Sequence, residues 1–137
     1  MIVFLSFPNR DAKYRRVVSV LRERGLTVLT NFDGTGREGP TEKADQHLAR
    51  IRKCTAFVFF SSDAPRNSWS PLRQIEFGYA LGREKSVAFV GKTFSSLHNY
   101  GDVFDDVDDF LRWWYSDEYY NAMDRWYSYR EGASAVA

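Results

Sequence analysis

The sequence predicts a single α/β domain with a five-stranded, mainly parallel sheet, flavodoxin-like or Rossmann-like, and helices on both faces of that sheet. Two observations carry this prediction. Short and largely apolar runs, the pattern of strands buried on both faces, alternate with segments of helical spacing through short loops. The chain has 137 residues, enough for one domain with one core and too few for two. The apolar runs that we expect as strands are residues 2–6, 26–30, 56–60 and 86–90.

Three helices are expected between these strands. The first, 10–24, carries apolar residues at helical spacing and ends before Gly25, a residue typical of helix C-termini. The second, 41–53, is polar apart from Leu48 and Ile51, which we expect to face inward. The third follows the third strand and holds the most informative residues of the chain.

The C-terminal part, 105–130, predicts two further helices that divide near residues 115–116. Its many Trp and Tyr side chains are typical of a segment that covers one face of a sheet or forms a subunit interface. The acidic cluster at 102–109 does not have the spacing of a calcium loop and favours a solvated helix start. We expect the domain to span 1–131 and residues 132–137 to form a disordered tail.

The third helix, 70–82, places a carboxylate where an apolar side chain is expected. Leu72, Ile75 and Tyr79 have the spacing of a stripe that faces a core, and Glu76 falls on the same stripe. Burial of an unpaired carboxylate is costly, so a glutamate there indicates either a fixed partner or a catalytic task. Glu76 is therefore the candidate catalytic residue.

The start of this helix indicates an anion site. Ser70 followed by Pro71 is a strong helix start, with the serine as N-cap and the proline in the first turn. The free amides of a helix N-terminus favour an anion such as phosphate. Ligands of parallel sheets bind at the carboxyl ends of the strands, and the loops at 7–10, 31–36 and 61–70 should share that edge.

Composition excludes several classes of protein. A formal net charge of +1 gives no electrostatic reason to expect a nucleic-acid polymer or an anionic membrane as partner. One cysteine, Cys54, excludes an intrachain disulfide framework and fits a reducing cytoplasm. His47 and His98 do not form a metal pair, and we expect His47 to be exposed on its helix and no metal or cofactor to be needed. No apolar run reaches the length of a membrane span, and the first seven residues indicate a strand and not a signal peptide.

The order Ile75-Glu76-Phe77-Gly78-Tyr79-Ala80, followed by Lys85 and an apolar strand, resembles the nucleoside 2-deoxyribosyltransferase superfamily. The opening Val3-Phe4-Leu5-Ser6-Phe7-Pro8-Asn9-Arg10 is similar to the first strand and loop of the same superfamily. It is most similar to the branch that cleaves pyrimidine nucleoside 5′-monophosphates. The resemblance covers residues 1–95 in outline.

This resemblance implies a set of roles. Glu76 would be the nucleophile that attacks the anomeric carbon and forms a glycosyl-enzyme ester. Ser70 would bind the 5′-phosphate, at a position where the transferases carry an Asp that holds a sugar hydroxyl. Phe4 would stack on the base and Arg10 would donate hydrogen bonds to it. The implied function is hydrolysis of the base–sugar bond of a nucleotide, with a deoxyribosyltransferase as the alternative.

The sequence also departs from the pattern of that superfamily. Where the superfamily has an Asp before the third strand, an ungapped match places His47. Asp45, two residues away, is the candidate to contact the substrate in its place, which would require a shifted helix. The superfamily completes each site with a polar residue from a neighbouring subunit, which implies a homo-oligomer of two or more chains. Ser95, Ser96 and Asn99 are the candidates for that residue.

A second family is similar over residues 1–90, the TIR domains, some of which split NAD with a helix glutamate and some of which signal by assembly. Ser61-Ser62 and Ser68-Trp69 before a helix glutamate carry this similarity. A structural alternative also stays open, in which Glu76 only pairs with an arginine such as Arg73 or Arg83. All of these enzymatic alternatives place a glutamate at a ribosyl C1′ and share a small nucleotide as partner.

Overall fold

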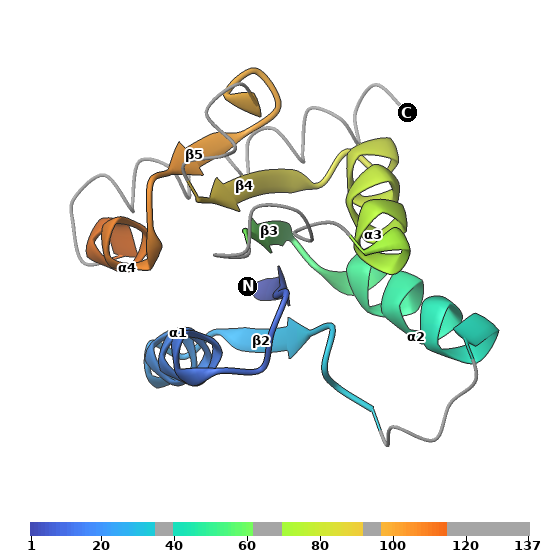
Figure 1. Ribbon diagram of the computed structural model, residues 1–137, viewed down its shortest axis with the longest axis horizontal. Coiled ribbons are helices and arrows are strands. Elements are labelled where there is room, and N and C mark those ends of the chain that lie inside the picture. The colour runs from blue at the N-terminus through green and yellow to red at the C-terminus, as the bar shows by residue number, and fades with distance from the viewer. Residues whose placement is uncertain (35–39, 62–69, 92–96, 115–137) are drawn as a thin grey trace.

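The computed structural model describes residues 1–34, 40–61, 70–91 and 97–114. In these ranges the chain forms one five-stranded, wholly parallel sheet in the order β2-β1-β3-β4-β5 (Figure 1). The predicted α/β class and the predicted parallel sheet are confirmed. The strands are β1 (Ile2–Ser6), β2 (Thr27–Thr30), β3 (Ala56–Phe60), β4 (Ser86–Val90) and β5 (Asp102–Phe104).

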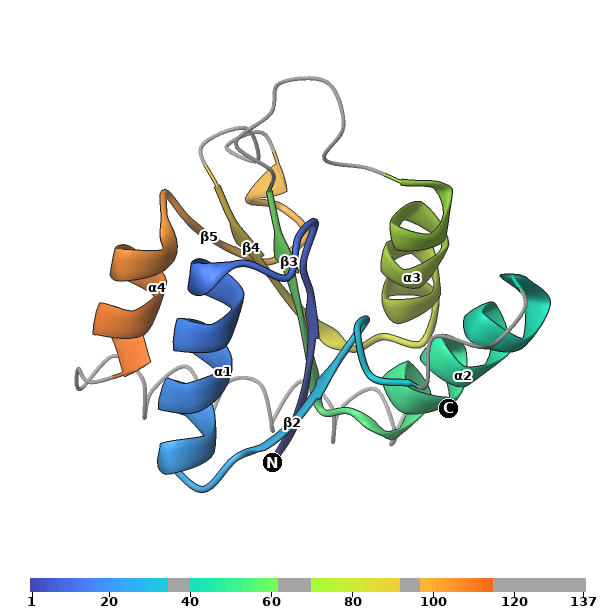
Figure 2. The same cartoon turned by 60° about the horizontal axis from the view of Figure 1, so that its bottom comes forward.

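Helices cover both faces of the sheet, as Figures 1 and 2 show. Helices α1 (Ala12–Glu23) and α4 (Val107–Trp114) lie on one face, whereas α2 (Pro40–Lys53) and α3 (Pro71–Gly82) lie on the other. Successive strand residues point to opposite faces, so the sheet supplies two separate cores. Val3, Leu5 and Val58 pack toward α1 and α4, whereas Phe4, Phe57 and Phe59 pack toward α2 and α3.

The strand order reverses between β1 and β3. The chain leaves β1 through α1 to β2, then crosses back through α2 to β3 on the opposite face. The two crossovers diverge at the carboxyl ends of β1 and β3, and an order of 2-1-3-4-5 places its ligand crevice at this point. The strand order therefore predicts a ligand site next to the ends of β1 and β3.

Helix boundaries follow the local sequence signals. Asp11 caps α1, because its carboxylate accepts a hydrogen bond from the amide of Tyr14 at 3.0 Å. At the other end Gly25 has a φ of 84°, and the amides of Gly25 and Leu26 donate to the carbonyls of Arg22 and Leu21. This is a Schellman ending, for which a glycine at the left-handed position is the favoured residue.

Two predicted details differ from the structure or lie outside it. No segment was assigned to the fifth strand, and the structure forms it from Asp102–Phe104, within the acidic cluster expected to be a helix start. The second half of that cluster does begin α4, where the Asp106 carboxylate accepts a hydrogen bond from the amide of Asp109 at 2.8 Å. The second aromatic helix and the tail 132–137 lie outside the described residues. Within the described ranges, no helix is both long and apolar enough to cross a membrane.

Candidate active site

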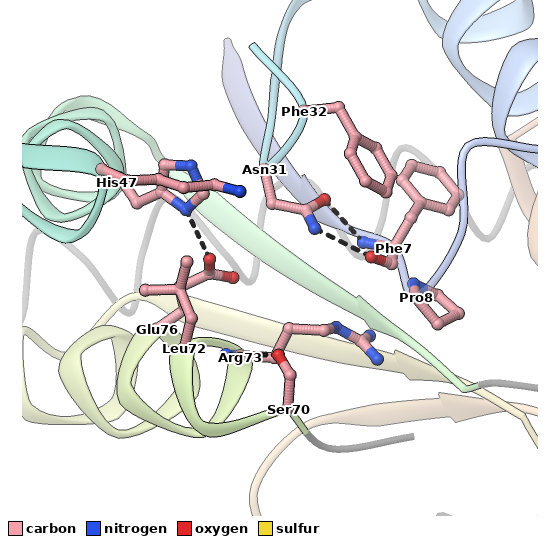
Figure 3. Close-up of a pocket in the computed structure, with 10 residues that line it drawn as sticks. Phe7, Pro8, Asn31, Phe32, His47, Ser70, Leu72, Arg73 and Glu76 are labelled. Atoms are coloured by element: carbon pink, nitrogen blue, oxygen red, sulfur yellow. Dashed lines mark hydrogen bonds and ion pairs between the residues drawn. The ribbon is translucent and has the colours of Figure 1, made fainter. Parts of the chain in front are cut away.

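A cavity of about 180 Å³ lies at the carboxyl ends of β1 and β2, against the facing sides of α2 and α3 (Figure 3). Its volume is below the roughly 300–1,000 Å³ of pockets that enclose a whole small molecule, so it can enclose the sugar ring of a nucleotide while the rest extends beyond it. The residues that line it are Phe7, Pro8, Asn31, Phe32, Lys43, His47, Ser70, Leu72, Arg73 and Glu76.

Glu76 is the buried carboxylate of this cavity. It is 0% exposed as a residue, yet its side chain forms part of the cavity wall. The Ser6 hydroxyl donates to one carboxylate oxygen at 3.0 Å, and Nδ1 of His47 lies 2.6 Å from the other. The sequence predicted that Glu76 lies on the inward face of the third helix, with either a fixed partner or a catalytic task, and the structure shows it buried with two fixed partners.

His47 is one of those partners, and the prediction that it is exposed is wrong. The side chain is 1% exposed and lies against Glu76 (Figure 3). Helix α2 turns His47 inward because His47 is one turn before Ile51, which is 0% exposed in the core. Two contacts hold α2 in place on either side: Arg50 donates to the Asp33 carbonyl at 2.7 Å, and Arg52 donates to the Tyr79 hydroxyl at 3.1 Å.

Arg73 connects the site to the ends of the two central strands. Its Nε donates to the Ser6 hydroxyl at 3.0 Å, and its terminal nitrogen donates to the carbonyls of Ser6 at 3.0 Å and of Phe60. The guanidinium also lies over the Phe59 ring, 4.0 Å from its centroid. Burial lowers the pKa of Arg73 to about 10, and the attraction of Glu76 opposes that fall. Arg73 is therefore a cation at neutral pH.

These contacts form a chain of donors that ends on Glu76. Arg73 donates to Ser6, and Ser6 donates to Glu76. A carboxylate that accepts fixed hydrogen bonds on both oxygens is held in one orientation, as a nucleophile has to be. The residues Ser6, His47 and Arg73 thus orient Glu76 at the cavity wall.

Asn31 fixes the loop on the opposite wall of the cavity. The amide of Phe7 donates to Oδ1 of Asn31 at 2.9 Å, and Nδ2 of Asn31 donates to the Phe7 carbonyl at 2.8 Å (Figure 3). The side chain extends the pairing of β1 with β2 past the last strand residues. The ring of Phe7 is held by stacking on Phe60 at a centroid distance of 4.1 Å. The β1–α1 loop therefore enters the site with a fixed backbone.

The buried face of α3 differs from the predicted stripe. Ile75 is 51% exposed, whereas Arg73, Glu76 and Ala80 are buried. The buried face is thus shifted by one residue from Leu72, Ile75 and Tyr79, because the crevice accepts a polar pair that is satisfied by β1 and α2. Glu76 belongs to both the predicted stripe and the observed buried face. Its inward orientation was therefore predicted correctly, although the stripe as a whole was not.

Ser70 lies where the sequence placed it, at the N-cap of α3 and on the cavity wall. Its hydroxyl accepts a hydrogen bond from the amide of Arg73 at 3.3 Å. The N-terminus of α3 therefore meets the same cavity as Glu76.

The other predicted contacts lie away from the cavity wall. Phe4 is 0% exposed in the core, where its ring stacks on Phe57 at 5.6 Å. Arg10 is exposed, with its guanidinium 5.9 Å from the centroid of the Tyr14 ring, and Asp45 is exposed on α2. The base contacts of Phe4 and Arg10 and the role of Asp45 stay predictions. Ser95 and Ser96 lie outside the described residues, and Asn99 is exposed in a turn.

Two residues that contact the Glu76 carboxylate, Ser6 and His47, were missed, although the sequence contained a signal for each. Ser6 has its side chain on the same face of β1 as Phe4, so it is a polar residue in an otherwise apolar strand. His47 is at helical spacing from Ile51, the same spacing that predicted an inward face for α2. Ser6 and His47 are each a polar residue within an otherwise buried face, and that interruption is the signal that identifies them.

No protein-family model matches the sequence, and comparison with curated proteins gives no match. Solved structures do match. The chain aligns with the CMP N-glycosidase BcmB from Clostridium botulinum at a TM-score of 0.59 and 21% identity, over 82% of this chain and 96% of that one. It aligns with a 2-desoxiribosyltransferase from Leishmania mexicana at a TM-score of 0.63 and 18% identity, over 82% of this chain and 95% of that one.

These two structures share the fold of this chain over most of its length. One is named as a CMP N-glycosidase and the other as a 2-desoxiribosyltransferase. The fold implied by the resemblance to the nucleoside 2-deoxyribosyltransferase superfamily is confirmed.

Proposed function

We propose that the protein is an N-glycosidase that hydrolyses the base–sugar bond of a nucleoside 5′-monophosphate with a pyrimidine base. The observation that carries the proposal is the position of Glu76. A buried carboxylate, held on both oxygens, forms part of a cavity wall at the carboxyl ends of β1 and β2. A carboxylate in this setting is suited to attack an anomeric carbon.

The chemistry follows a retaining glycosidase. One carboxylate oxygen of Glu76 attacks C1′ of the sugar, the C1′–N bond breaks, and its electron pair leaves with the base. The product of this step is a glycosyl ester on Glu76. Water then attacks C1′ of the ester and loses a proton, which releases the sugar 5-phosphate and regenerates the carboxylate; that proton balances the one taken up by the departed base. The transition state has positive charge on the sugar, and the nearby Glu76 carboxylate stabilises it.

The phosphate would bind at the N-terminus of α3. Ser70 offers a hydroxyl there, and the amides of the first turn and the helix dipole favour negative charge. Lys43 also lines the cavity and adds a positive charge. Because Ser70 and Glu76 are six residues apart on one helix, the phosphate and the anomeric carbon of a single nucleotide can reach them together.

The likeness to a CMP N-glycosidase supports hydrolysis, and the likeness to a 2-desoxiribosyltransferase supports the second candidate, transfer of the sugar to another base. The serine at the start of α3 favours the hydrolase, because an uncharged N-cap leaves the helix N-terminus open to phosphate. Transfer remains an outcome of the same assay, since a second base would intercept the ester in place of water.

The test is release of free base, measured by chromatography. The substrates are CMP, dCMP, UMP, dUMP, TMP and the purine monophosphates, each paired with its nucleoside, together with NAD. We expect base from a pyrimidine monophosphate and much less from the matching nucleoside. Release from nucleosides only, with exchange of added base, would replace hydrolysis by transfer. Nicotinamide from NAD alone would move the chain to the NAD-cleaving class.

A further inference from the structure

Nε2 of His47 is a buried polar atom that, among the described residues, has no hydrogen-bond partner. The side chain is 1% exposed and lines the cavity, so only water or a ligand inside the cavity can meet it. Buried polar atoms are paired in the large majority of cases, and an unpaired one in a native protein requires an explanation. His47 forms part of the cavity wall beside Glu76, with Asn31 and Phe7 across from them (Figure 3). We therefore expect the hydrogen-bond partner of Nε2 to be an atom of a bound ligand.

The contact with Glu76 determines the hydrogen-bonding role of each ring nitrogen of His47. A carboxylate only accepts hydrogen bonds, so Nδ1 carries the hydrogen of the 2.6 Å contact. Nε2 is then an acceptor in the neutral ring and a donor in the imidazolium. The ring is held rigidly by Glu76 on one side and by α2 on the other, so the direction of Nε2 is fixed as well.

The other charged groups of the cavity wall are poor alternatives as proton donors. Within the described ranges they are Lys43 on α2 and Arg73 and Glu76 on α3. Arg73 is a cation with its Nε on Ser6, and Lys43 is exposed to water. Glu76 has to be unprotonated to attack carbon. Ser6, which faces Glu76 from β1, does not titrate in the relevant range.

We propose that His47 is the acid–base catalyst of the proposed glycosidase, acting through Nε2; this inference rests on the proposed function. In the first step Glu76 attacks C1′ and the C1′–N bond breaks. The electron pair stays on the departing base, and the Nε2 proton of the imidazolium neutralises it. In the second step the neutral Nε2 takes a proton from water as the water oxygen attacks C1′ of the ester. The Glu76 carboxylate and the imidazolium are both restored.

The test compares two leaving groups in one protein. CMP needs a proton on its base, whereas 4-nitrophenyl ribofuranoside 5-phosphate releases a phenolate that departs without one. The variant His47→Asn keeps an amide nitrogen near the position of Nδ1, which can still donate to Glu76, and removes Nε2. The variant Glu76→Gln removes the nucleophile and is the reference for complete loss.

We expect His47→Asn to lower kcat/KM on CMP by about 100-fold or more, the usual contribution of a general acid, and to change it on the nitrophenyl substrate by no more than about threefold. Glu76→Gln should abolish both reactions. Equal losses of His47→Asn on the two substrates would overturn the proposal, because His47 would then act only by holding Glu76. Full activity of His47→Asn on CMP would overturn it too.

A second measurement uses only the wild-type protein, so misfolding of a variant cannot affect its result. In the wild-type protein, kcat/KM on CMP should fall on the alkaline side, as it does in reactions that need a general acid, whereas kcat/KM on the nitrophenyl substrate should not show that limb. The same limb on both substrates would contradict the proposal. If the wild-type protein cleaves neither substrate, the glycosidase itself is wrong. Cleavage of both without this difference leaves the glycosidase standing and removes only the role of His47.

Discussion

At the scale of single residues, the site depends on a serine that joins two charged side chains. Ser6 accepts a hydrogen bond from Arg73 and donates one to Glu76, and it is 0% exposed. A buried donor or acceptor that loses its partner costs more than the bond itself contributed. Ser6 therefore affects both stability and the orientation of the carboxylate.

Replacing Ser6 by alanine should lower the free energy of unfolding by about 1–3 kcal/mol, because both Nε of Arg73 and one oxygen of Glu76 lose a buried partner. Urea unfolding measures this change. Ser19→Ala, on the exposed face of α1, is the matched control and should stay within about 0.5 kcal/mol of wild type. If the two variants unfold alike, the hydrogen bonds of Ser6 do not hold the site.

The lowered pKa of Arg73 predicts an alkaline effect on stability. Burial lowers its pKa on folding to about 10, below the ordinary value of an arginine in the unfolded chain. Between these two pKa values the unfolded chain binds more protons than the folded one, so the contribution of Arg73 to the free energy of unfolding rises with pH there and is constant below. Burial of the cation therefore costs most at neutral pH.

The measurement compares wild type with Arg73→Met by urea unfolding at pH 7, pH 9 and pH 11. Other groups titrate in both proteins and cancel in the difference. From pH 9 to pH 11 the wild type should gain on the order of 1 kcal/mol relative to Arg73→Met, and between pH 7 and pH 9 it should gain almost nothing. A relative gain between pH 7 and pH 9 would assign the titration to another group.

The residues of the site were only partly predictable from the sequence. Glu76 was located because it interrupts the apolar stripe of its helix. Ser70 was located because it completes the N-cap signal of the same helix. Ser6, His47 and Arg73 gain their roles from contacts between elements distant in the chain: Ser6 is 70 residues from Glu76, and His47 is 29. Such pairings depend on the crossover of α2, which no local pattern specifies.

At the scale of elements, the end of α3 carries a conformational cost. Glu84 has a φ of 57°, and the amides of Glu84 and Lys85 donate to the carbonyls of Leu81 and Ala80. This is a Schellman ending like that of α1, but with a glutamate where a glycine is favoured. A side chain in the left-handed region costs roughly 1–2 kcal/mol.

Glu84→Gly should therefore raise the free energy of unfolding by about 1 kcal/mol, less the entropy that glycine adds to the unfolded chain. Glu84→Ala is the matched control, because it removes the carboxylate and keeps the strained φ, and it should leave stability nearly unchanged. Thermal or urea unfolding of the three proteins decides this. A gain in Glu84→Ala equal to that in Glu84→Gly would place the cost in the charge and not in the backbone.

The N-terminus of α3 allows a charge test that spares the fold. Aspartate caps a helix about as well as serine, so Ser70→Asp should fold normally while it repels a phosphate. We expect its kcat/KM on a monophosphate, relative to the nucleoside, to fall about tenfold or more. Ser70→Asn, an uncharged cap, should keep the wild-type ratio. An unchanged ratio in Ser70→Asp would show that phosphate binds elsewhere.

Most elements were predictable because their signals are local. The strands 2–6, 56–60 and 86–90 were predicted at the observed bounds, since runs such as Ala56–Phe60 are buried on both faces. Strand β5 has only three residues, all partly exposed, and so lacks that signal. The face of α3 was shifted because hydrophobic spacing could not reveal that the crevice accepts Arg73 and Glu76.

At the scale of the whole molecule, the topology of the sheet determines where the residues of the site meet. The strand order 2-1-3-4-5 opens a crevice between the ends of β1 and β3, and Arg73 donates to a carbonyl at the end of each of these strands. From the opposite element, α2 brings His47 to Glu76. The sheet order itself was not predicted, because the sequence shows which segments are strands but not how they are arranged.

The central claim, that Glu76 is a nucleophile, is tested most directly by trapping the ester. Incubation with a 2′-fluoro arabino analogue of CMP, which slows hydrolysis of the ester, should add one sugar phosphate to the protein, and peptide mass spectrometry should place it on Glu76. Glu76→Gln should take up none, whereas Glu84→Gln, altered at an exposed glutamate, should be labelled like wild type. Base release by the wild type with no adduct on Glu76, or an adduct that persists in Glu76→Gln, would contradict the account.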